Sequence, residues 1–340
     1  MRVSAKAHRV PRGVRDSALA FAVIVIFGSG AMLLAGVNPL DGFSALLLGA
    51  LGSTPEIAET LVQTTALLFP ALGIALAFRA GLFNIGAEGQ LVIGGLVAGI
   101  LGERLLAPGA VAIPCLLIAG AIGGGLWGAL AGLLRARFGA NEVIATLMLN
   151  YVALQVAAYA ITGPFRTEAG GGNETGLLPA TSWLPTIVPD TRLTIALILA
   201  LALALLLRWL FRSTVIGYEL RAAGEAPQTA RRAGIDLAKT AFWTMAASGA
   251  IAGLGGATIV TGVLHRFNLA LSPGYGFIGI AVALVGELDP LWVTVAAFVF
   301  GVLQNGAIGM QAAANVPRDV VTAIEGLIIL VLSGRRILAR

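Results

Sequence analysis

The stretch RLTIALILALALALLLRWLF, residues 192–211, carries an unbroken apolar run between Arg192 and Arg208. A helix needs roughly 20 predominantly apolar residues to cross the hydrocarbon core of a bilayer, and this stretch has that length. The rest of the chain has a similar composition, because 58% of its 340 residues are hydrophobic and only 11% are charged. Soluble domains carry about 25% charged residues. The stretch therefore predicts a membrane-spanning helix, and the composition predicts that most of the chain lies in lipid.

Apolar stretches of this kind recur along the sequence and predict an all-α, polytopic membrane protein with about ten transmembrane helices. The helices and their connections use up the chain, so no soluble catalytic domain is expected. Span eight is the shortest, and Pro273 precedes it, so a re-entrant or broken helix is the alternative to a full crossing there. The predicted spans are residues 18–37, 58–78, 85–101, 110–133, 142–162, 192–211, 240–262, 275–287, 291–309 and 319–333.

The basic residues set the predicted orientation. With the N-terminus inside and the sides alternating, 17 of the 22 basic residues fall on cytoplasmic segments, as the positive-inside rule requires. Both termini are therefore predicted to be cytoplasmic, with a basic tail at 1–17, a transmembrane domain at 18–333 and a second tail at 334–340. Two loops are long, an outer one at 163–191 and a basic, partly helical inner one at 212–238.

A weak internal duplication accompanies this pattern. The dipeptide Phe-Asn occurs at the start of span three and again before span eight, and a proline precedes both span four and span nine. An offset of five spans turns the second copy over in the membrane, so spans 1–5 and 6–10 form a predicted inverted repeat. Inverted repeats with broken helices are a recurring architecture of transporters, which favours transport over membrane-bound enzymology. The matching positions are Phe83, Asn84, Phe267, Asn268, Pro108 and Pro290.

Several chemistries lack the residues that they need. One cysteine, Cys115, and two histidines, His8 and His265, rule out a disulfide framework and argue against a Cys/His metal site. The sequence contains no P-loop, G-x-S-x-G or H-E-x-x-H pattern, so no catalytic residue, metal or cofactor is predicted. The G-x-G-x-x-G pattern at 274–279 opens an apolar span without a preceding strand, which argues against a dinucleotide site. Scattered basic residues fit membrane topology rather than nucleic-acid binding.

Polar side chains inside the spans mark candidate sites. Asn84, Glu88 and Gln90 lie in GLFNIGAEGQ, residues 81–90, whose glycines weaken a regular helix. A carboxylate deep in the membrane costs about 2.5 kcal/mol or more. Three alternatives follow: the segment borders a translocation path, its polar groups satisfy a bent backbone, or Glu88 lies at the cytoplasmic interface. A choice between a path and interhelical hydrogen bonds also applies to Asn141, Glu142, Asn150, Gln155, Gln304, Asn305 and Glu325.

Glycines recur every four residues in two of the predicted spans. Small residues at this spacing let helix backbones approach closely. The pattern favours tight packing within the bundle, and a sliding or gating face is the alternative. The residues are Gly120, Gly124, Gly128 and Gly132 in span four, and Gly249 and Gly253 in span seven.

Four motifs resemble a known family: GLFNIGAEGQ (81–90), GANEVIATLMLNY (139–151), GYELRAAGEAP (217–227) and LSPGYGFIGIAVALVG (271–286). Together they resemble permease subunits of bacterial ABC importers in the branched-chain amino acid and simple sugar group, and most of all the nucleoside permeases. The similarity runs from about residue 55 to the end of the chain. It implies a multi-pass protein of the bacterial cytoplasmic (inner) membrane. It also implies a second permease subunit, cytoplasmic ABC ATPases and an extracytoplasmic substrate-binding lipoprotein as partners, besides membrane lipid.

The resemblance assigns a role to the inner loop. This loop would be the coupling helix that docks in an ATPase groove, although by its pattern alone it also fits an ordinary solvated amphipathic loop. Ala226 stands where relatives usually have Asn, which leaves one cap or contact of the loop open. The predicted coupling residues are Gly217, Arg221, Ala222, Gly224, Glu225, Ala230, Gly234 and Ile235.

The sequence therefore predicts a subunit that forms half of a membrane pore for a nucleoside and is not itself an enzyme, because ATP hydrolysis belongs to a partner ATPase. One alternative keeps this role for a simple sugar such as ribose or for a branched-chain amino acid. Another is an ion-coupled secondary transporter with Glu88 or Glu325 as the coupling carboxylate. An intramembrane enzyme is the least favoured. The predicted translocation path consists of Phe83, Asn84, Glu88, Gln90, Asn141, Asn150, Phe267 and Asn268.

Overall fold

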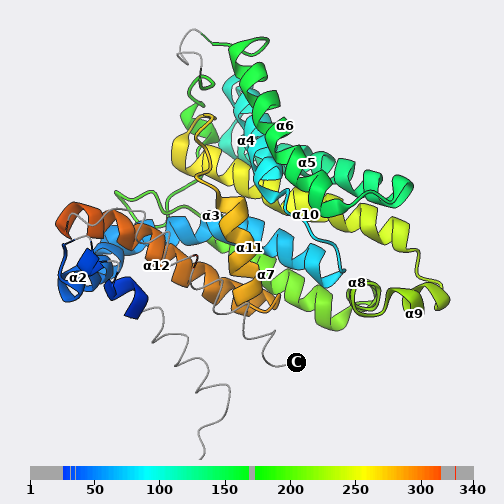
Figure 1. The fold of residues 1–340 in the computed structure, drawn as a ribbon. Helices are drawn as coiled ribbons and strands as arrows, with labels where there is room; N and C mark the ends of the chain where they lie inside the picture. The colour runs from blue at the N-terminus through cyan, green and yellow to red at the C-terminus, as the bar shows by residue number, and fades with distance from the viewer. Residues whose placement is uncertain (1–25, 31, 35, 168–172, 315–325, 327–340) are drawn as a thin grey trace, which may run out of the picture. The chain divides into compact units, whose positions relative to one another are not determined.

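The computed structural model describes residues 26–30, 32–34, 36–167, 173–314 and 326 (Figure 1). The chain divides into two compact units, Ser53–Val302 and Met1–Gly52 together with Leu303–Arg340. All regular elements among the described residues are helices, and six of these are long and apolar enough to cross a membrane. Half of predicted span one and all of predicted span ten except residue 326 lie outside the described residues. Ten crossings and the inverted repeat therefore stay predictions.

Every predicted span between residues 58 and 309 coincides with a helix. The lengths differ: α5 has 30 residues where the predicted span 110–133 has 24, and α11 has 11 residues where the predicted span 275–287 has 13. The helices of the Ser53–Val302 unit are α3 (Thr54–Arg79), α4 (Ala87–Arg104), α5 (Gly109–Phe138), α6 (Glu142–Thr162), α7 (Ala196–Ser213), α8 (Val215–Glu225), α9 (Pro227–Arg232), α10 (Leu237–Ile259), α11 (Tyr275–Val285) and the first part of α12 (Pro290–Ala314).

Local sequence explains where these helices begin and end. Gly139 adopts φ 63° and ends α5 in the left-handed conformation that glycine tolerates best. Asn141 then caps α6, because its side-chain oxygen accepts hydrogen bonds from Val143 N at 2.9 Å and Ile144 N at 3.4 Å. The α5–α6 connection is therefore a tight turn.

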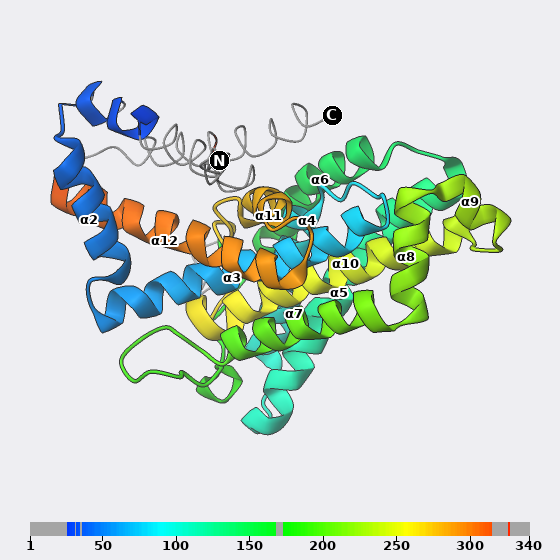
Figure 2. The same cartoon turned by 90° about the horizontal axis from the view of Figure 1, so that it is seen from below.

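Helix α10 packs against α5, α4 and α3 within the Ser53–Val302 unit (Figures 1 and 2). Its contact with α5 follows the glycine faces of both helices. A Cβ atom added at Gly124 would lie 2.6 Å from Gly253 Cα, and one at Gly132 would lie 3.0 Å from Phe242 Cα. Gly94 of α4 meets Gly253 in the same way. The predicted tight packing is confirmed, since no side chain larger than hydrogen fits between these backbones.

Helix α10 continues into a π-helical turn, η3 (Val260–Leu264), to which the outer loop is attached. The carbonyl of Thr261 accepts a hydrogen bond from Leu184 N at 2.9 Å, and that of His265 accepts one from Leu178 N at 2.8 Å. The Trp183 ring stacks on His265 with ring centroids 3.9 Å apart. The wider turn therefore leaves backbone carbonyls available to the loop.

The other unit contains a helix that the sequence analysis did not predict, α2 (Pro39–Leu51). Asn38 caps it through Leu40 N at 3.1 Å, and Pro39 occupies its first position. Within this unit α2 packs on the last part of α12. A Cβ atom at Gly309 would lie 2.5 Å from Gly49 Cα, and Asn305 Nδ2 donates to the Gly49 carbonyl at 3.2 Å.

Candidate functional site

The connection between α3 and α4, residues 80–86, holds the first group of predicted site residues. It is not helical, and Gly81, its second residue, has a φ of 72°. Its Asn84 side chain is buried and contacts Ser248 of α10. Ser248 follows the first residue of α10, Leu237, by eleven positions, which at 1.5 Å per residue is about 17 Å along the helix. The break therefore contacts the interior of α10 rather than one of its ends.

Asn84 forms a closed hydrogen-bond network with its neighbours. Its Nδ2 donates to Gln90 Oε1 and to Ser248 Oγ, each at 2.8 Å. Its Oδ1 accepts from Gly86 N at 3.0 Å and from Gln90 Nε2 at 3.1 Å. Ser248 Oγ in turn donates to the Gly73 carbonyl of α3 at 2.6 Å. One buried amide thus links α3, α4 and α10.

Asn150 of α6 holds the same connection from another helix. Its Oδ1 accepts a hydrogen bond from Gly89 N at 2.8 Å, and its Nδ2 donates to the Ile85 carbonyl at 2.9 Å. Thr146 Oγ1 accepts from Ile85 N at 3.2 Å. These bonds are the ones expected of polar side chains that satisfy a bent backbone, which is one of the alternatives considered above. A role of these residues in translocation stays a proposal.

Glu88 of α4 contacts the start of the short helix α11. Its Oε2 accepts a hydrogen bond from Gly276 N at 2.7 Å. Unsatisfied N–H groups and the helix dipole make a helix N-terminus favourable for a carboxylate. A Cβ atom at Gly276 would lie 2.5 Å from Glu88 Cα, so this glycine of the G-x-G-x-x-G pattern permits close packing. With 11 residues, α11 is too short to cross a bilayer alone.

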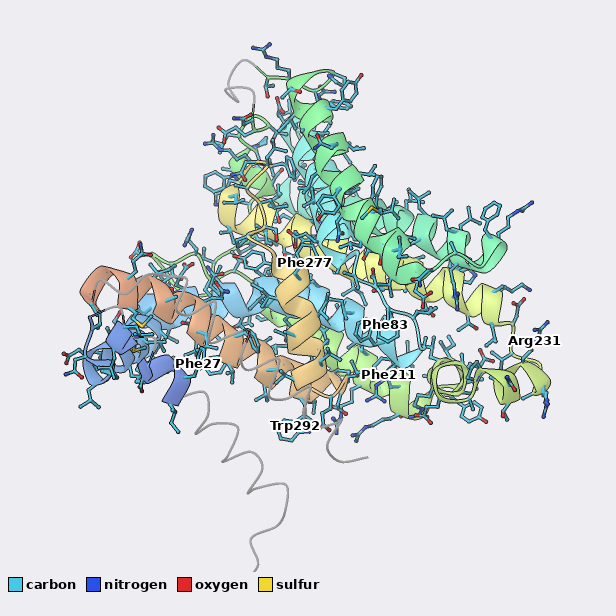
Figure 3. The ribbon with its side chains drawn as sticks, in the orientation of Figure 1. Phe27, Phe83, Phe211, Arg231, Phe277 and Trp292 are labelled. Atoms are coloured by element: carbon cyan, nitrogen blue, oxygen red, sulfur yellow. The ribbon has the colours of Figure 1, made fainter. Side chains whose placement is uncertain are left out.

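The remaining predicted path residues lie elsewhere. Phe83 is 52% exposed (Figure 3), and Asn141 is exposed as the cap of α6. Phe267 is fully buried beside the second half of α4, where a Cβ atom on Gly99 would lie 2.5 Å from the Cβ of Phe267. Gly99 is eleven residues after Glu88, or about 17 Å along α4. The structure therefore brings Asn84, Glu88, Gln90 and Asn150 together and places Phe267 and its neighbour Asn268 apart from them.

The inner loop forms the two short helices α8 and α9. Thr214 caps α8, since its Oγ1 accepts from Gly217 N at 3.1 Å. The buried side of α8 consists of Gly217, Leu220 and Ala223. We call the exposed side the α8–α9 surface, which comprises Val215, Ile216 and Tyr218 of α8, 73%, 59% and 62% exposed, with the exposed Arg231 and Arg232 of α9 (Figure 3).

Gly224 attaches α8 to the polar connection described above. A Cβ atom at Gly224 would lie 2.8 Å from Gly81 N and 3.0 Å from the carbonyl carbon of Ala80. The backbone of α8 therefore rests directly on the end of α3. Of the other predicted coupling residues, Ala230 is buried, Arg221, Ala222 and Ile235 are half-buried, and Glu225 and Gly234 are exposed.

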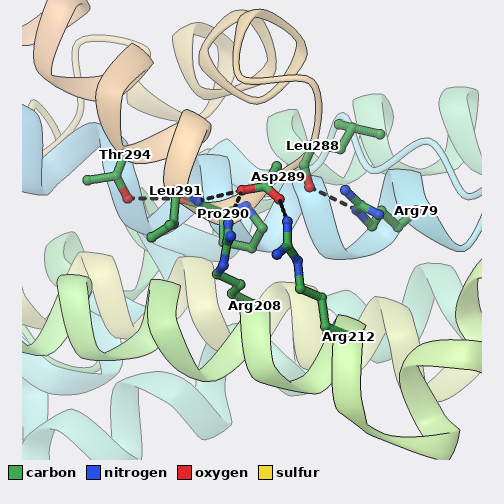
Figure 4. Close-up of polar contacts among 8 residues, drawn as sticks. All are labelled: Arg79, Arg208, Arg212, Leu288, Asp289, Pro290, Leu291 and Thr294. Carbon is green, nitrogen blue, oxygen red and sulfur yellow. Dashed lines mark hydrogen bonds and ion pairs between the residues drawn. The ribbon is translucent and has the colours of Figure 1, made fainter.

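The sequence analysis missed a charged group at the turn between α11 and α12 (Figure 4). Asp289 Oδ1 accepts a hydrogen bond from Arg208 Nη1 at 3.0 Å, and Oδ2 lies 3.4 Å from Arg212 Nη2. Arg79 Nε donates to the Leu288 carbonyl at 2.9 Å. Asp289 followed by proline is a helix-start signal, but nothing local in the sequence shows which arginines it meets.

A bundle of apolar helices, six of them in the described part of the chain long enough to cross a bilayer, together with a buried polar break and an exposed helical pair, defines an integral membrane protein. The family model for the permease component of branched-chain amino acid transport systems matches residues 56–333. The chain belongs to this family of ABC transporter permeases, which are multi-pass proteins of the cell membrane.

Curated relatives align over most of their own length. The guanosine ABC transporter permease protein NupP of Bacillus subtilis is 36% identical, covering 92% of this chain and 91% of the relative. The nucleoside ABC transporter permease protein NupB of Lactococcus lactis is 34% identical, covering 92% and 88%. The glucose ABC transporter permease protein TsgB13 of Haloferax volcanii is 30% identical, covering 90% and 83%. No solved structure matches the chain.

Family membership decides between the classes considered above. Permease subunits of ABC transporters are not enzymes themselves, because ATP is hydrolysed on a separate ATPase. The ion-coupled secondary transporter accordingly loses its support. Of its two candidate carboxylates, Glu88 is engaged by Gly276 N, and Glu325 lies outside the described residues.

Proposed function

We propose that this chain is the membrane subunit of a nucleoside importer and forms half of the translocation pore. A second permease subunit would supply the other half, and an extracytoplasmic binding lipoprotein would deliver the nucleoside. The names of two relatives at 36% and 34% identity support this substrate class. A simple sugar is the second candidate, because the 30% identical relative is named for glucose.

The α8–α9 surface is the observation that carries the proposal. Three apolar or aromatic side chains are exposed on α8 and two arginines are exposed on α9, and both helices lie outside the predicted spans. A surface of this kind suits a protein partner rather than lipid tails. Because Gly224 holds α8 against the end of α3, a partner ATPase bound here would act directly on the helices of the unit. Both termini and this surface would be cytoplasmic.

A polar stripe on α6 supports the second permease subunit. Tyr151, Gln155 and Tyr159 are spaced four residues apart, and all three are exposed. Gln155 is at least about 10 Å from either end of α6. An amide exposed to hydrocarbon at that depth is costly. We infer that this stripe faces the other permease across a hydrated path, together with the break that holds Asn84 and Glu88.

Reconstitution tests the proposed function. The chain is purified with its partner permease and ATPase, placed in proteoliposomes with the binding protein, and assayed for uptake of labelled guanosine and inosine. The expected result is uptake that requires ATP and that excess unlabelled nucleoside competes away, whereas glucose and ribose do not. Competition by sugars would establish the sugar alternative. Uptake without ATP that collapses with the proton gradient would contradict the ABC mechanism.

One substitution tests the α8–α9 surface. Gly224→Arg places a long side chain where even a Cβ atom lies 2.8 Å from Gly81 N, so α8 must leave its position. ATP-dependent uptake and co-isolation of the ATPase are both expected to be lost. Phe138→Arg is the matched control, because it adds the same side chain at the exposed last residue of α5, outside the inner loop. Retention of both properties in Gly224→Arg would contradict the proposal.

A further inference from the structure

The turn between α11 and α12, residues 286–289, has an unfavourable backbone. Glu287 and Leu288 adopt φ values of 52° and 59°. This left-handed region is disfavoured for residues with a Cβ atom and is rare for side chains such as Glu and Leu. Such strain persists only where surrounding contacts over-determine the conformation, and it is concentrated at functional and switch regions.

Three arginines from two other helices over-determine this turn (Figure 4). Arg79, the last residue of α3, donates from Nε to the carbonyl of the strained Leu288 at 2.9 Å. Arg208 and Arg212 of α7 lie one helical turn apart and bind the two carboxylate oxygens of Asp289 at 3.0 and 3.4 Å. Asp289 Oδ1 also accepts from Leu291 N at 3.1 Å and so caps α12. One carboxylate thus joins the start of α12 to the end of α7.

The arginine-bearing end of α7 is continuous with the α8–α9 surface. Only Thr214 separates α7 from α8. Gly217 allows the two helices to pack closely at this junction, because a Cβ atom there would lie 2.7 Å from Phe211 Cα. The guanidinium of Arg79 lies over the Phe211 ring, 5.0 Å from its centroid. A displacement of α8 therefore moves the groups that clamp the turn.

The other end of α11 lies at the polar break. Glu88 binds Gly276 N in the first turn of α11. Gly279 packs along α3, since a Cβ atom there would lie 3.2 Å from Ala71 N and 3.4 Å from Pro70 Cβ. Helix α11 has 11 residues, and a rod of that length, about 17 Å, spans the distance between the clamped turn and Glu88.

Resting on the proposed function, we propose that Asp289 is a positioning residue of the transport cycle. It ties the end of α7 to the turn that carries α11, so that movement of α8 by the ATPase shifts α11 relative to Glu88. The strained Glu287–Leu288 pair is the element with two conformations, one clamped by the arginines and one relaxed. Coupling between two sites requires a bistable element of this kind.

The test uses the complete reconstituted transporter, with nucleoside uptake and ATP hydrolysis measured on the same vesicles. Asp289→Asn keeps an oxygen that caps α12 but removes the charge that binds the two arginines. Uptake is expected to fall on the order of tenfold, within the range of known coupling free energies. ATP hydrolysis is expected to continue, so fewer nucleosides are moved for each ATP. Arg208→Gln with Arg212→Gln leaves the cap untouched and is expected to give the same result if Asp289→Asn does not assemble.

Glu103→Gln is the control. Glu103 lies outside the inner loop, and its Oε2 accepts a hydrogen bond from Gly176 N at 3.1 Å. The same change from a carboxylate to an amide is therefore made at another side chain that accepts from a backbone N–H group, away from the predicted coupling residues. The ratio of uptake to ATP hydrolysis is expected to stay at the wild-type value.

A second variant distinguishes a role of the turn in coupling ATP hydrolysis to uptake from a role in stabilising the fold. Leu288→Gly relieves the backbone strain and leaves every charge in place. The expected result is a lower ratio of uptake to ATP hydrolysis with an unchanged or higher thermal unfolding temperature. The proposal is overturned if Asp289→Asn and Leu288→Gly both keep the wild-type ratio. If the wild-type complex itself shows no ATP-dependent nucleoside uptake, the proposed function has failed instead.

Discussion

At the α5–α10 interface two helices meet through glycines, whereas at the α11–α12 turn helices are joined through charges. The backbones of Gly124 and Gly253 are in direct contact, and close-packed interfaces have low compressibility. The side chain of Asp289 is 17% exposed and that of its partner Arg212 is 58% exposed, so water can replace each partner of this pair at small cost. The difference predicts that α5 and α10 form a rigid frame, against which the turn and α11 can shift.

The largest expected effect comes from breaking the frame. Gly124→Val inserts a branched side chain where a single Cβ atom already lies 2.6 Å from Gly253 Cα. Overpacking of this kind costs about 1–3 kcal/mol or more, because the backbones of α5 and α10 must separate. The thermal unfolding temperature in detergent and the yield of monodisperse protein are both expected to fall.

Cys115→Val is the control for that substitution. Cys115 is exposed on the same helix, so added bulk meets no neighbouring backbone, and stability is expected to stay within about 0.5 kcal/mol of wild type. Equal stability of Gly124→Val and Cys115→Val would show that the glycine interface is not rigid, and the contrast with the turn would disappear.

A second prediction concerns the far end of α11. Glu88→Ala removes the acceptor of Gly276 N and leaves a buried N–H group unsatisfied, which costs about 1–3 kcal/mol. Glu88→Gln keeps a carbonyl oxygen at the same place and is expected to be closer to wild type in thermal unfolding. If both variants unfold alike, the contact does not hold α11, and the turn alone would position that helix.

A third prediction separates the two roles of Asp289. Asp289→Ala removes the cap of α12 together with the ion pairs, and a lost cap costs about 1 kcal/mol. Asp289→Asn keeps the cap and is expected to lose less stability, because the pairs with the partly exposed arginines contribute little. Chemical denaturation of the two variants measures the difference. An equal loss in the two variants would mean that the ion pairs, and not the cap, carry the contribution of Asp289 to stability.

The sequence was sufficient to predict the bounds of helices whose apolar runs are continuous. Residues 142–162 were predicted and observed with the same bounds, because Asn141 marks the start and the run has no internal break. Helix α2 was missed, since Asp41 and Gly42 interrupt its apolar residues. Its start signal, Asn38 followed by Pro39, was nevertheless present in the sequence.

The contacts within the candidate site were harder to predict from the sequence than the helices were. The glycine faces were predicted as packing surfaces because their spacing is local. The polar residues of the break were predicted as candidates for a translocation path, with satisfaction of a bent backbone as an alternative. Their partners were not predicted, because Ser248 is 164 positions from Asn84 and Leu288 is 209 positions from Arg79. Contacts at such separations depend on which helices become neighbours, and residue spacing in a single sequence does not determine that.

The smallest expected effect lies at the outer end of the frame, where His265 follows the π turn of α10 just beyond the span. Burial beside Trp183 lowers the pKa of His265 below its usual value of about 6.5. The folded state therefore binds this proton less readily than the unfolded state does, so the stabilisation is present above about pH 6.5 and is lost as the pH falls.

Fluorescence of Trp183, in a variant with the other tryptophans replaced by Phe, is expected to report local opening of the outer loop on acidification. Unfolding of the glycine frame is expected to stay unchanged, and His265→Gln is expected to abolish the pH dependence. A pH-dependent signal that persists in His265→Gln would assign the opening to another group and remove His265 from this role.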